Sequence, residues 1–187
     1  MKKQKDENKK TVIKAIFAWE DEKEEKWLEQ MAAEGWKLVS VAPYVYHFER
    51  SQPEKVVFRL DYKHMIDKDY QEYLTLFKDA GWELFATFSN WHYFKINPEN
   101  QETPEIYNSG KAKAQKYRRL ITGLVPLFPI YLVVLNPALR VSETSSEFAN
   151  VLLTVARIFF TFFILFVGFF MLKIWSKIKQ LESDSKE

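Results

Sequence analysis

The sequence of 187 residues contains no cysteine and only five glycines. The absence of cysteine excludes disulfide scaffolds, zinc ribbons, thiol nucleophiles and thiol redox switches. The glycines do not form either common phosphate-binding loop, Gly-x-Gly-x-x-Gly or Gly-x-x-x-x-Gly-Lys. A Gly-x-Ser-x-Gly nucleophile elbow is also missing, which argues against a serine hydrolase of that type.

Histidine is scarce as well, with only His47, His64 and His92. None has a His-x-x-x-His or His-Glu spacing, and a metal site needs three or four converging ligands with support behind them. We therefore expect these histidines to be structural or exposed strand residues. We expect no metal, no cofactor and no enzymatic activity.

The charges nearly cancel over the whole chain, with a formal net charge of +2, but they are unevenly distributed. Residues 1–110 carry 16 Lys and Arg against 20 Asp and Glu, whereas residues 111–187 carry 11 against 5. A nucleic-acid binder usually has a basic domain or stripe. The near-neutral total therefore argues against a nucleic-acid partner.

Two hydrophobic stretches dominate the second part of the chain. Residues 120–139 contain no charge, and twenty helical residues at about 1.5 Å each cover a hydrocarbon core of roughly 30 Å. Residues 148–172 are rich in phenylalanine and hold one charge, Arg157. The sequence predicts two transmembrane helices, 120–139 and 150–172, joined by an external loop, 140–149.

Basic residues flank these stretches on the sides away from the loop. Lysines and arginines crowd residues 111–119 and lysines follow in 173–187, whereas the loop holds one arginine and two glutamates. By the positive-inside rule both termini are cytoplasmic and the loop is outside. The charged residues 1–10 have no hydrophobic core behind them, so we interpret them as a solvated tail rather than a signal peptide. The lipid bilayer is the first partner that we expect.

Arg157 has two interpretations. Near the outer end of its span, its long side chain can reach the lipid headgroups. Alternatively, it makes an intramembrane contact with another subunit or protein. Pro126, Pro129 and Pro137 indicate that the first span is kinked, which membranes tolerate when neighbouring groups satisfy the freed carbonyls.

The N-terminal part contains an internal repeat at an offset of 46. Residues 27–48, WLEQMAAEGWKLVSVAPYVYHF, align with residues 73–94, YLTLFKDAGWELFATFSNWHYF. The alignment places the Gly-Trp pair at 35–36 over a second pair at 81–82. Aligned pairs that follow aligned helical stretches are moderately specific for duplication.

Each copy has the pattern strand–helix–strand–strand. In the second copy Tyr73, Leu74 and Phe77 share one helical face with a tyrosine three residues before them. Gly35 and Gly81 supply the left-handed residue that ends each helix. Alternating polar and apolar residues follow, as in a hairpin with one buried face.

The pair of copies predicts an α+β domain over residues 11–97. We expect an antiparallel sheet of about six strands with both helices on one of its faces. Residues 98–119 lose this periodicity, and we interpret them as a connector followed by a basic juxtamembrane segment.

An antiparallel sheet covered on one side leaves its other face open. Val45, Trp91 and Tyr93 fall on the face opposite the expected helices. Exposed aromatic residues are typical of a dimer or partner surface. The alternatives are that the two faces are interchanged or that the tail covers these residues.

An acidic run opens the first expected helix: Glu20, Asp21, Glu22, Glu24 and Glu25. Such a run complements the helix dipole and usually forms a solvated face. The alternative is a docking face for a basic partner, including the lysine-rich residues 111–119 of this chain or of a neighbour. Solvated acids are poor candidates for acid–base catalysis, which requires burial and raised pKa values.

Four stretches of the sequence resemble a known bacterial family: FAWEDEKEEKWLEQMAAEGWKL, DAGWELF, WHYF and EIYNSGKAKAQKYRR. The family is catalogued as domain of unknown function 2812, and the resemblance covers about residues 11–119. It implies a cytoplasmic domain tethered to the inner membrane, with a role in an envelope or stress response. It provides no catalytic residues.

Together these features predict a membrane-tethered cytoplasmic binding or regulatory adaptor protein, with a protein partner or a second copy of itself. The alternative is a small accessory subunit of a membrane transport or immunity complex, in which the transmembrane hairpin is the interaction element.

Overall fold

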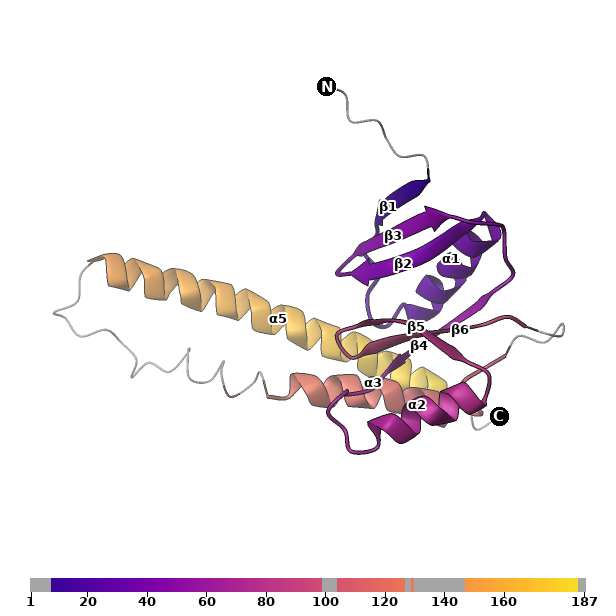
Figure 1. Ribbon diagram of the computed structural model, residues 1–187. Coiled ribbons are helices and arrows are strands. Elements are labelled where there is room, and N and C mark those ends of the chain that lie inside the picture. The colour runs from indigo at the N-terminus through magenta and orange to yellow at the C-terminus, as the bar shows by residue number, and fades with distance from the viewer. Residues whose placement is uncertain (1–7, 99–103, 127–128, 130–146, 185–187) are drawn as a thin grey trace, which may run out of the picture. The chain divides into compact units, whose positions relative to one another are not determined.

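The computed structural model describes residues 8–98, 104–126, 129 and 147–184. In chain order its strands and helices are β1 (Lys9–Ile13), α1 (Asp21–Ala33), β2 (Trp36–Ala42), β3 (Val45–Arg50), β4 (Val57–Tyr62), α2 (Tyr70–Asp79), β5 (Glu83–Phe88), β6 (Trp91–Ile96), α3 (Gly110–Leu124) and α5 (Glu147–Asp184) (Figure 1). The chain divides into two compact units, Met1–Lys116, which we call the domain, and Tyr117–Glu187, which we call the C-terminal unit. The domain therefore extends into residues for which the sequence predicted a connector.

The domain consists of two halves with the same order of elements. The first half is β1-α1-β2-β3 and the second is β4-α2-β5-β6. Gly35 and Gly81 have φ values of 80° and 84°, so both helices end at a left-handed glycine, as predicted. A bulge interrupts β2 after Leu38 and β5 after Leu84, at matching positions of the two halves.

The α+β class is confirmed, but the expected single sheet is wrong. The strands form two antiparallel three-stranded sheets, ordered β1-β3-β2 and β4-β6-β5. Bulges twist an edge strand away from further pairing. The bulged strands β2 and β5 are edge strands that contact each other without forming a ladder, so each half keeps a sheet of its own.

The expectation that both helices cover one face is also wrong. Helix α1 packs between the two sheets, where Leu28 shares a core cluster with Phe48 of β3 and Phe58 of β4. Helix α2 covers the opposite face of the second sheet, where Phe77 stacks on Phe94 with ring centroids 4.0 Å apart. The second sheet is therefore covered on both faces, and every residue of β4 is buried.

The first sheet has one covered face. Tyr46 and Phe48 of β3 point into the core, whereas His47 and Glu49 on the same strand are exposed. The partner strand β1 shows the same alternation, with Thr11 and Ile13 exposed. Solvent therefore reaches the outer face of the first sheet.

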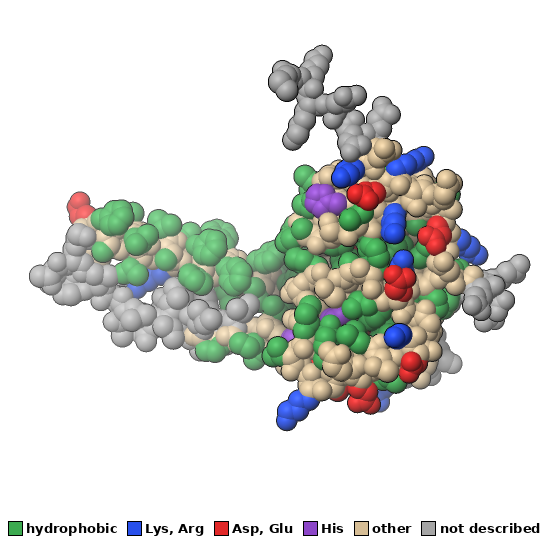
Figure 2. Space-filling model, in the orientation of Figure 1, with side chains coloured by type: hydrophobic (Ala, Val, Ile, Leu, Met, Phe, Trp, Pro, Cys, Tyr) green, Lys and Arg blue, Asp and Glu red, His purple; other side chains and the backbone are tan. Residues whose placement is uncertain are grey.

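In the C-terminal unit, α5 is long and apolar enough to cross a membrane. Its 38 residues span about 57 Å at 1.5 Å each, more than the roughly 30 Å of a hydrocarbon core. The most apolar part is not buried within the chain, and phenylalanines such as Phe159, Phe162 and Phe166 are exposed. Figure 2 shows hydrophobic side chains at the surface along this helix. The predicted span 150–172 lies within this helix.

The first predicted span is not established. Residues 120–124 are the last residues of α3, which ends just before Pro126, as expected because proline disfavours a helical residue in front of it. Pro129 is helical, but the rest of 127–139 and most of the loop 140–149 lie outside the described residues. Among the residues that the structure describes, one helix rather than two meets the criteria for a membrane span.

Candidate functional site

The acidic start of α1 is largely buried, so its interpretation as a solvated face is wrong for three side chains. Asp21, Glu24 and Glu25 are only 1%, 7% and 5% exposed. Removing a carboxylate from water costs several kcal/mol unless a cation and hydrogen bonds compensate. The partners of these three groups therefore define the candidate site.

Lys116 in the second turn of α3 is the cation of this site. Its ammonium forms an ion pair with Asp21 and donates a hydrogen bond to the carbonyl oxygen of Leu60, 2.9 Å away. One turn earlier, Lys113 pairs with Glu22 at 2.9 Å. The alternative in which the acidic run docks the lysine-rich segment of the same chain is thus the arrangement observed.

Burial and neighbouring charges shift the pKa values of Lys116 and Glu25 in opposite directions. Burial alone would lower the pKa of Lys116, but the carboxylates of Asp21 and Glu25 outweigh it, so this pKa lies above its ordinary value. Burial raises the pKa of Glu25 to about 7, although Lys116 partly opposes the shift. Glu25 therefore titrates near neutral pH while Lys116 stays charged.

Glu24 links the two sheets through a single oxygen. Its Oε1 accepts hydrogen bonds of 2.8 Å from the hydroxyls of both Tyr46 in β3 and Tyr93 in β6. Burial raises the pKa of Glu24, whereas the two hydroxyl donors oppose that rise. A buried carboxylate with two donors from different sheets fixes α1 between them.

Glu25 and Glu29 of α1 accept the backbone hydrogen bonds at the outer edge of β4. The backbone N–H of Leu60 donates to Glu25 at 2.8 Å, and that of Phe58 donates to Glu29 at 3.2 Å. Arg59 between them pairs with Glu29 at 3.2 Å and with Glu105 at 2.7 Å. Side chains of α1 thus take the place of a further strand at an edge that would otherwise invite pairing.

A second polar cluster lies on the α2 side of the second sheet. Asp61 accepts hydrogen bonds from the hydroxyls of Tyr73, at 3.0 Å, and Tyr107. His92 is fully buried and lies 3.0 Å from the carbonyl oxygen of Asn90 through Nδ1. A carbonyl only accepts, so Nδ1 carries the proton and Nε2 accepts from the Tyr70 hydroxyl at 2.8 Å. Burial lowers the pKa of His92, so this histidine is neutral and structural.

The described residues contain no group of three or more His, Asp or Glu side chains placed to hold a metal ion. His47 lies on the exposed face of the first sheet, where its Nδ1 is 3.0 Å from the hydroxyl of Thr11. The chemistry of the described site is ion pairing and hydrogen bonding between buried groups.

The predicted partner surface does not form. Tyr93 is 4% exposed and belongs to the core, and Trp91 is half-buried against the same core. The face that carries them is covered by α1 and the first sheet, which follows from the split into two sheets. Val45 of β3 corresponds to Trp91 in the internal repeat. It is half-exposed on the open face of the first sheet and stays a candidate for contact with a partner.

Arg157 lies on α5 and is half-exposed. Its Nη2 is buried, and within the described part of the chain no hydrogen-bond partner for it is present. Its predicted role in an intramembrane contact stays a prediction.

The sequence pointed to Lys116 only as one member of the lysine-rich residues 111–119, and it did not point to Arg59, Asp61 or Tyr107. A signal was present in β4, VFRLDY, where charged residues alternate with apolar ones in a strand that is otherwise fully hydrophobic. Charges in such a strand indicate buried partners elsewhere in the chain.

Comparison with protein families places this region of the chain in a known family. The model of the family described as "Protein of unknown function (DUF2812)" matches residues 20–128. No curated protein and no solved structure shows significant similarity to the chain. The matched region begins at Glu20, the first residue of the acidic run, and continues beyond the end of α3.

Proposed function

Because the chain belongs to the DUF2812 family, for which no activity is known, we propose a function from its own geometry: it is a membrane-tethered binding and regulatory adaptor. In this proposal the α+β domain lies at the cytoplasmic face of a bacterial inner membrane and binds a protein partner or a second copy. It binds rather than catalyses.

The single observation that carries this proposal is the docking of α3 on the domain. Lys113 and Lys116 anchor the first turns of α3 to Glu22, Asp21 and the Leu60 carbonyl. This same helix continues to Leu124, at the start of the chain's hydrophobic part. A conformational change in the domain would therefore be transmitted to that helix directly, as an adaptor requires.

The proposed topology has two membrane crossings, with both termini cytoplasmic. Within the C-terminal unit, Arg118 of α3 forms an ion pair with Glu182 near the end of α5. Residues that pair lie on the same side of a membrane, so this ion pair supports an even number of crossings between them. The basic flanks of both stretches support the cytoplasmic side.

The absence of cysteine makes this topology directly testable. Single-cysteine variants Ser142→Cys and Ser176→Cys would be treated in intact cells with a membrane-impermeant maleimide. We expect labelling of Ser142→Cys in intact cells and labelling of Ser176→Cys only after permeabilisation. Labelling of both in intact cells would contradict the topology.

The adaptor function is tested by crosslinking in native membranes followed by affinity capture. The full chain would be compared with the Lys116→Met variant, which releases α3, and with the matched control Lys68→Met at an exposed position. We expect the same specific partner with the wild type and Lys68→Met and its loss with Lys116→Met. A partner retained equally by all three would mean that docking of α3 has no part in binding.

A second candidate is the accessory subunit of a transport or immunity complex. It is favoured by the buried Arg157 Nη2, for which no hydrogen-bond partner is present among the described residues. Replacing Arg157 with Leu discriminates between the two candidates. If captured partner and phenotype are unchanged in Arg157→Leu, the second candidate is eliminated.

A further inference from the structure

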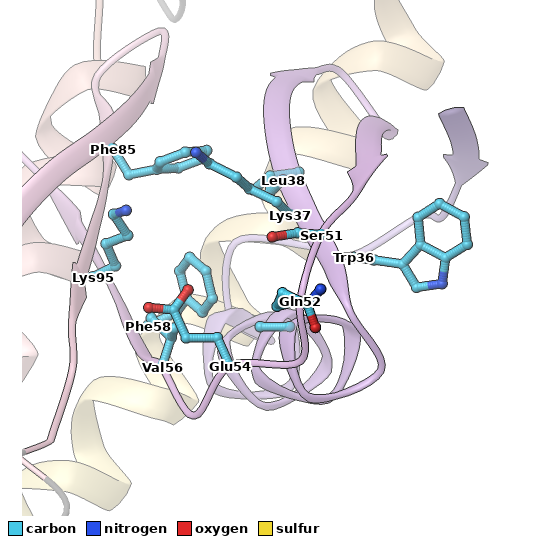
Figure 3. A pocket seen from close by; sticks show the side chains of 11 residues that line it. Trp36, Lys37, Leu38, Ser51, Gln52, Glu54, Val56, Phe58, Phe85 and Lys95 are labelled. Atoms are coloured by element: carbon cyan, nitrogen blue, oxygen red, sulfur yellow. The ribbon is translucent and has the colours of Figure 1, made fainter. Parts of the chain in front are cut away.

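A pocket of about 260 Å³ opens between the two halves of the domain (Figure 3). Its floor is apolar, formed by Ala32, Leu38, Val56 and Phe58, all of which are buried in the core. A water molecule occupies about 30 Å³ of liquid, so the pocket has room for roughly nine waters or for a small bicyclic molecule. Sites for drug-sized ligands are larger, about 300–1,000 Å³.

The pocket exists because the two sheets do not join. It lies where β2 and β5 approach without forming a ladder. The bulge in β5 falls at Phe85, whose ring lines the pocket. This ring packs edge to face on the ring of Phe58, with the two ring centroids 6.4 Å apart. Bulges commonly redirect a side chain next to a binding site. At the matching bulge of β2, Val39 is exposed and does not line the pocket.

Two lysines and one glutamate lie at the mouth. Lys37 from β2 and Lys95 from β6 extend toward Phe85 (Figure 3). Lys95 is partly neutralised by Glu83, 3.2 Å away, and its ammonium lies 5.4 Å from the centre of the Phe85 ring. Lys37 makes no ion pair within the described residues. Glu54, the glutamate at the mouth, accepts a hydrogen bond of 2.9 Å from the side-chain amide of Asn97.

We propose that this pocket binds a small organic anion with a flat apolar body, of the aromatic carboxylate class. The ring of such a ligand would lie against the apolar floor beside Phe58 and Phe85, in the geometry that aromatic pairs prefer. Its carboxylate would meet Lys37, the cation of the mouth that is not already paired. The proposal does not depend on the membrane topology, because every lining residue belongs to the domain.

The test uses the full chain in detergent and 2-naphthoate as the probe, with its uncharged analogue 2-naphthamide for comparison. Binding would be measured by isothermal titration calorimetry, with each ligand also titrated into protein-free micelles. We expect saturable binding of 2-naphthoate at one site per chain and about tenfold weaker binding of the amide, because the amide lacks the charge. Equal affinity for the two ligands, or no saturable binding, would overturn the proposal.

Variants locate the site. Lys37→Met keeps the length of the side chain and removes its charge, and we expect it to weaken 2-naphthoate binding about tenfold. Lys68→Met, at an exposed lysine outside the pocket, is the matched control and should leave the affinity unchanged. Glu54→Gln removes the negative charge at the mouth and should strengthen binding a few-fold. If Lys37→Met and Lys68→Met bind the probe equally, the site lies elsewhere and the proposal is wrong.

Discussion

Helices α1 and α2 occupy the same place in the two halves of the domain, yet they differ in burial. Six residues of α1 are buried, three of them acidic, whereas α2 has no buried residue. Helix α1 lies between two sheets and α2 covers the outer face of one. The two halves share one pattern of elements but have unequal positions in the core.

The two halves of the domain depend on each other for stability. The second sheet relies on α1 of the first half to cover Leu60 and Tyr93 and to satisfy the edge of β4. We therefore expect the domain to unfold in one cooperative transition. Substitutions in α1 should destabilise both halves, whereas substitutions in α2 should destabilise mainly the second half.

Removing the buried cation should break this arrangement most severely. Lys116→Met leaves Asp21 buried without its counter-ion and removes one of the two cations near Glu25, the other being Arg59 at 3.8 Å. We expect the free energy of unfolding to fall by about 3–5 kcal/mol. The measurement is chemical denaturation of the full chain followed by tryptophan fluorescence. Lys78→Met, at an exposed position of α2, is the control and should change stability by no more than about 0.5 kcal/mol. Equal effects of the two variants would contradict the role of Lys116.

A matched pair of leucines tests the difference between the helices. Leu28 of α1 is 1% exposed, whereas Leu74, its counterpart in α2, is half-buried. We expect Leu28→Ala to lower the free energy of unfolding by about 2–5 kcal/mol, because the cavity lies between two sheets. Leu74→Ala should lower it by about 1 kcal/mol. Similar losses in the same denaturation experiment would mean that the two helices contribute equally.

The buried acids of α1 should make stability depend on pH. The pKa of Glu25 is raised from 4.5 to about 7 in the folded chain, so the protonated form is favoured on folding. The stabilisation that protonation brings is complete below pH 4.5 and is lost as the pH rises through about 7, an effect on the order of 3 kcal/mol. Glu25→Gln should flatten this part of the stability–pH profile, whereas Glu72→Gln on α2 should leave it unchanged. A profile that is identical in wild type and Glu25→Gln would refute this assignment.

The smallest expected effect concerns the two hydroxyls on Glu24. Tyr46→Phe and Tyr93→Phe each remove one hydrogen bond to a buried carboxylate, and we expect each to lower stability by about 1–2 kcal/mol. The double variant should lose more than the sum, because Glu24 then has neither donor. Tyr44→Phe, at an exposed turn position, is the control. Simple additivity of the two single variants would show that the hydroxyls do not share one acceptor.

Local features of the fold were predictable from the sequence. The left-handed positions of Gly35 and Gly81, the order of strands and helices, and the apolar character of α5 all depend on residues close together in the chain. The candidate site was only half predictable. The sequence named the acidic run and the lysine-rich segment as possible partners, but it could not choose between a solvated face and a docked one.

The set of strands and helices follows from local patterns in the sequence, because helical spacing, strand alternation and turn residues act over a few positions. Which faces of the sheets are covered depends on how these strands and helices pack in three dimensions. The bulges in β2 and β5 separate the sheets, α1 then enters between them, and this one placement buries Asp21, Glu24 and Glu25 together with Tyr93. Those outcomes depend on contacts between residues distant in the chain. The pair of Lys116 with Asp21 is an example, because it forms only once α3 has packed against α1.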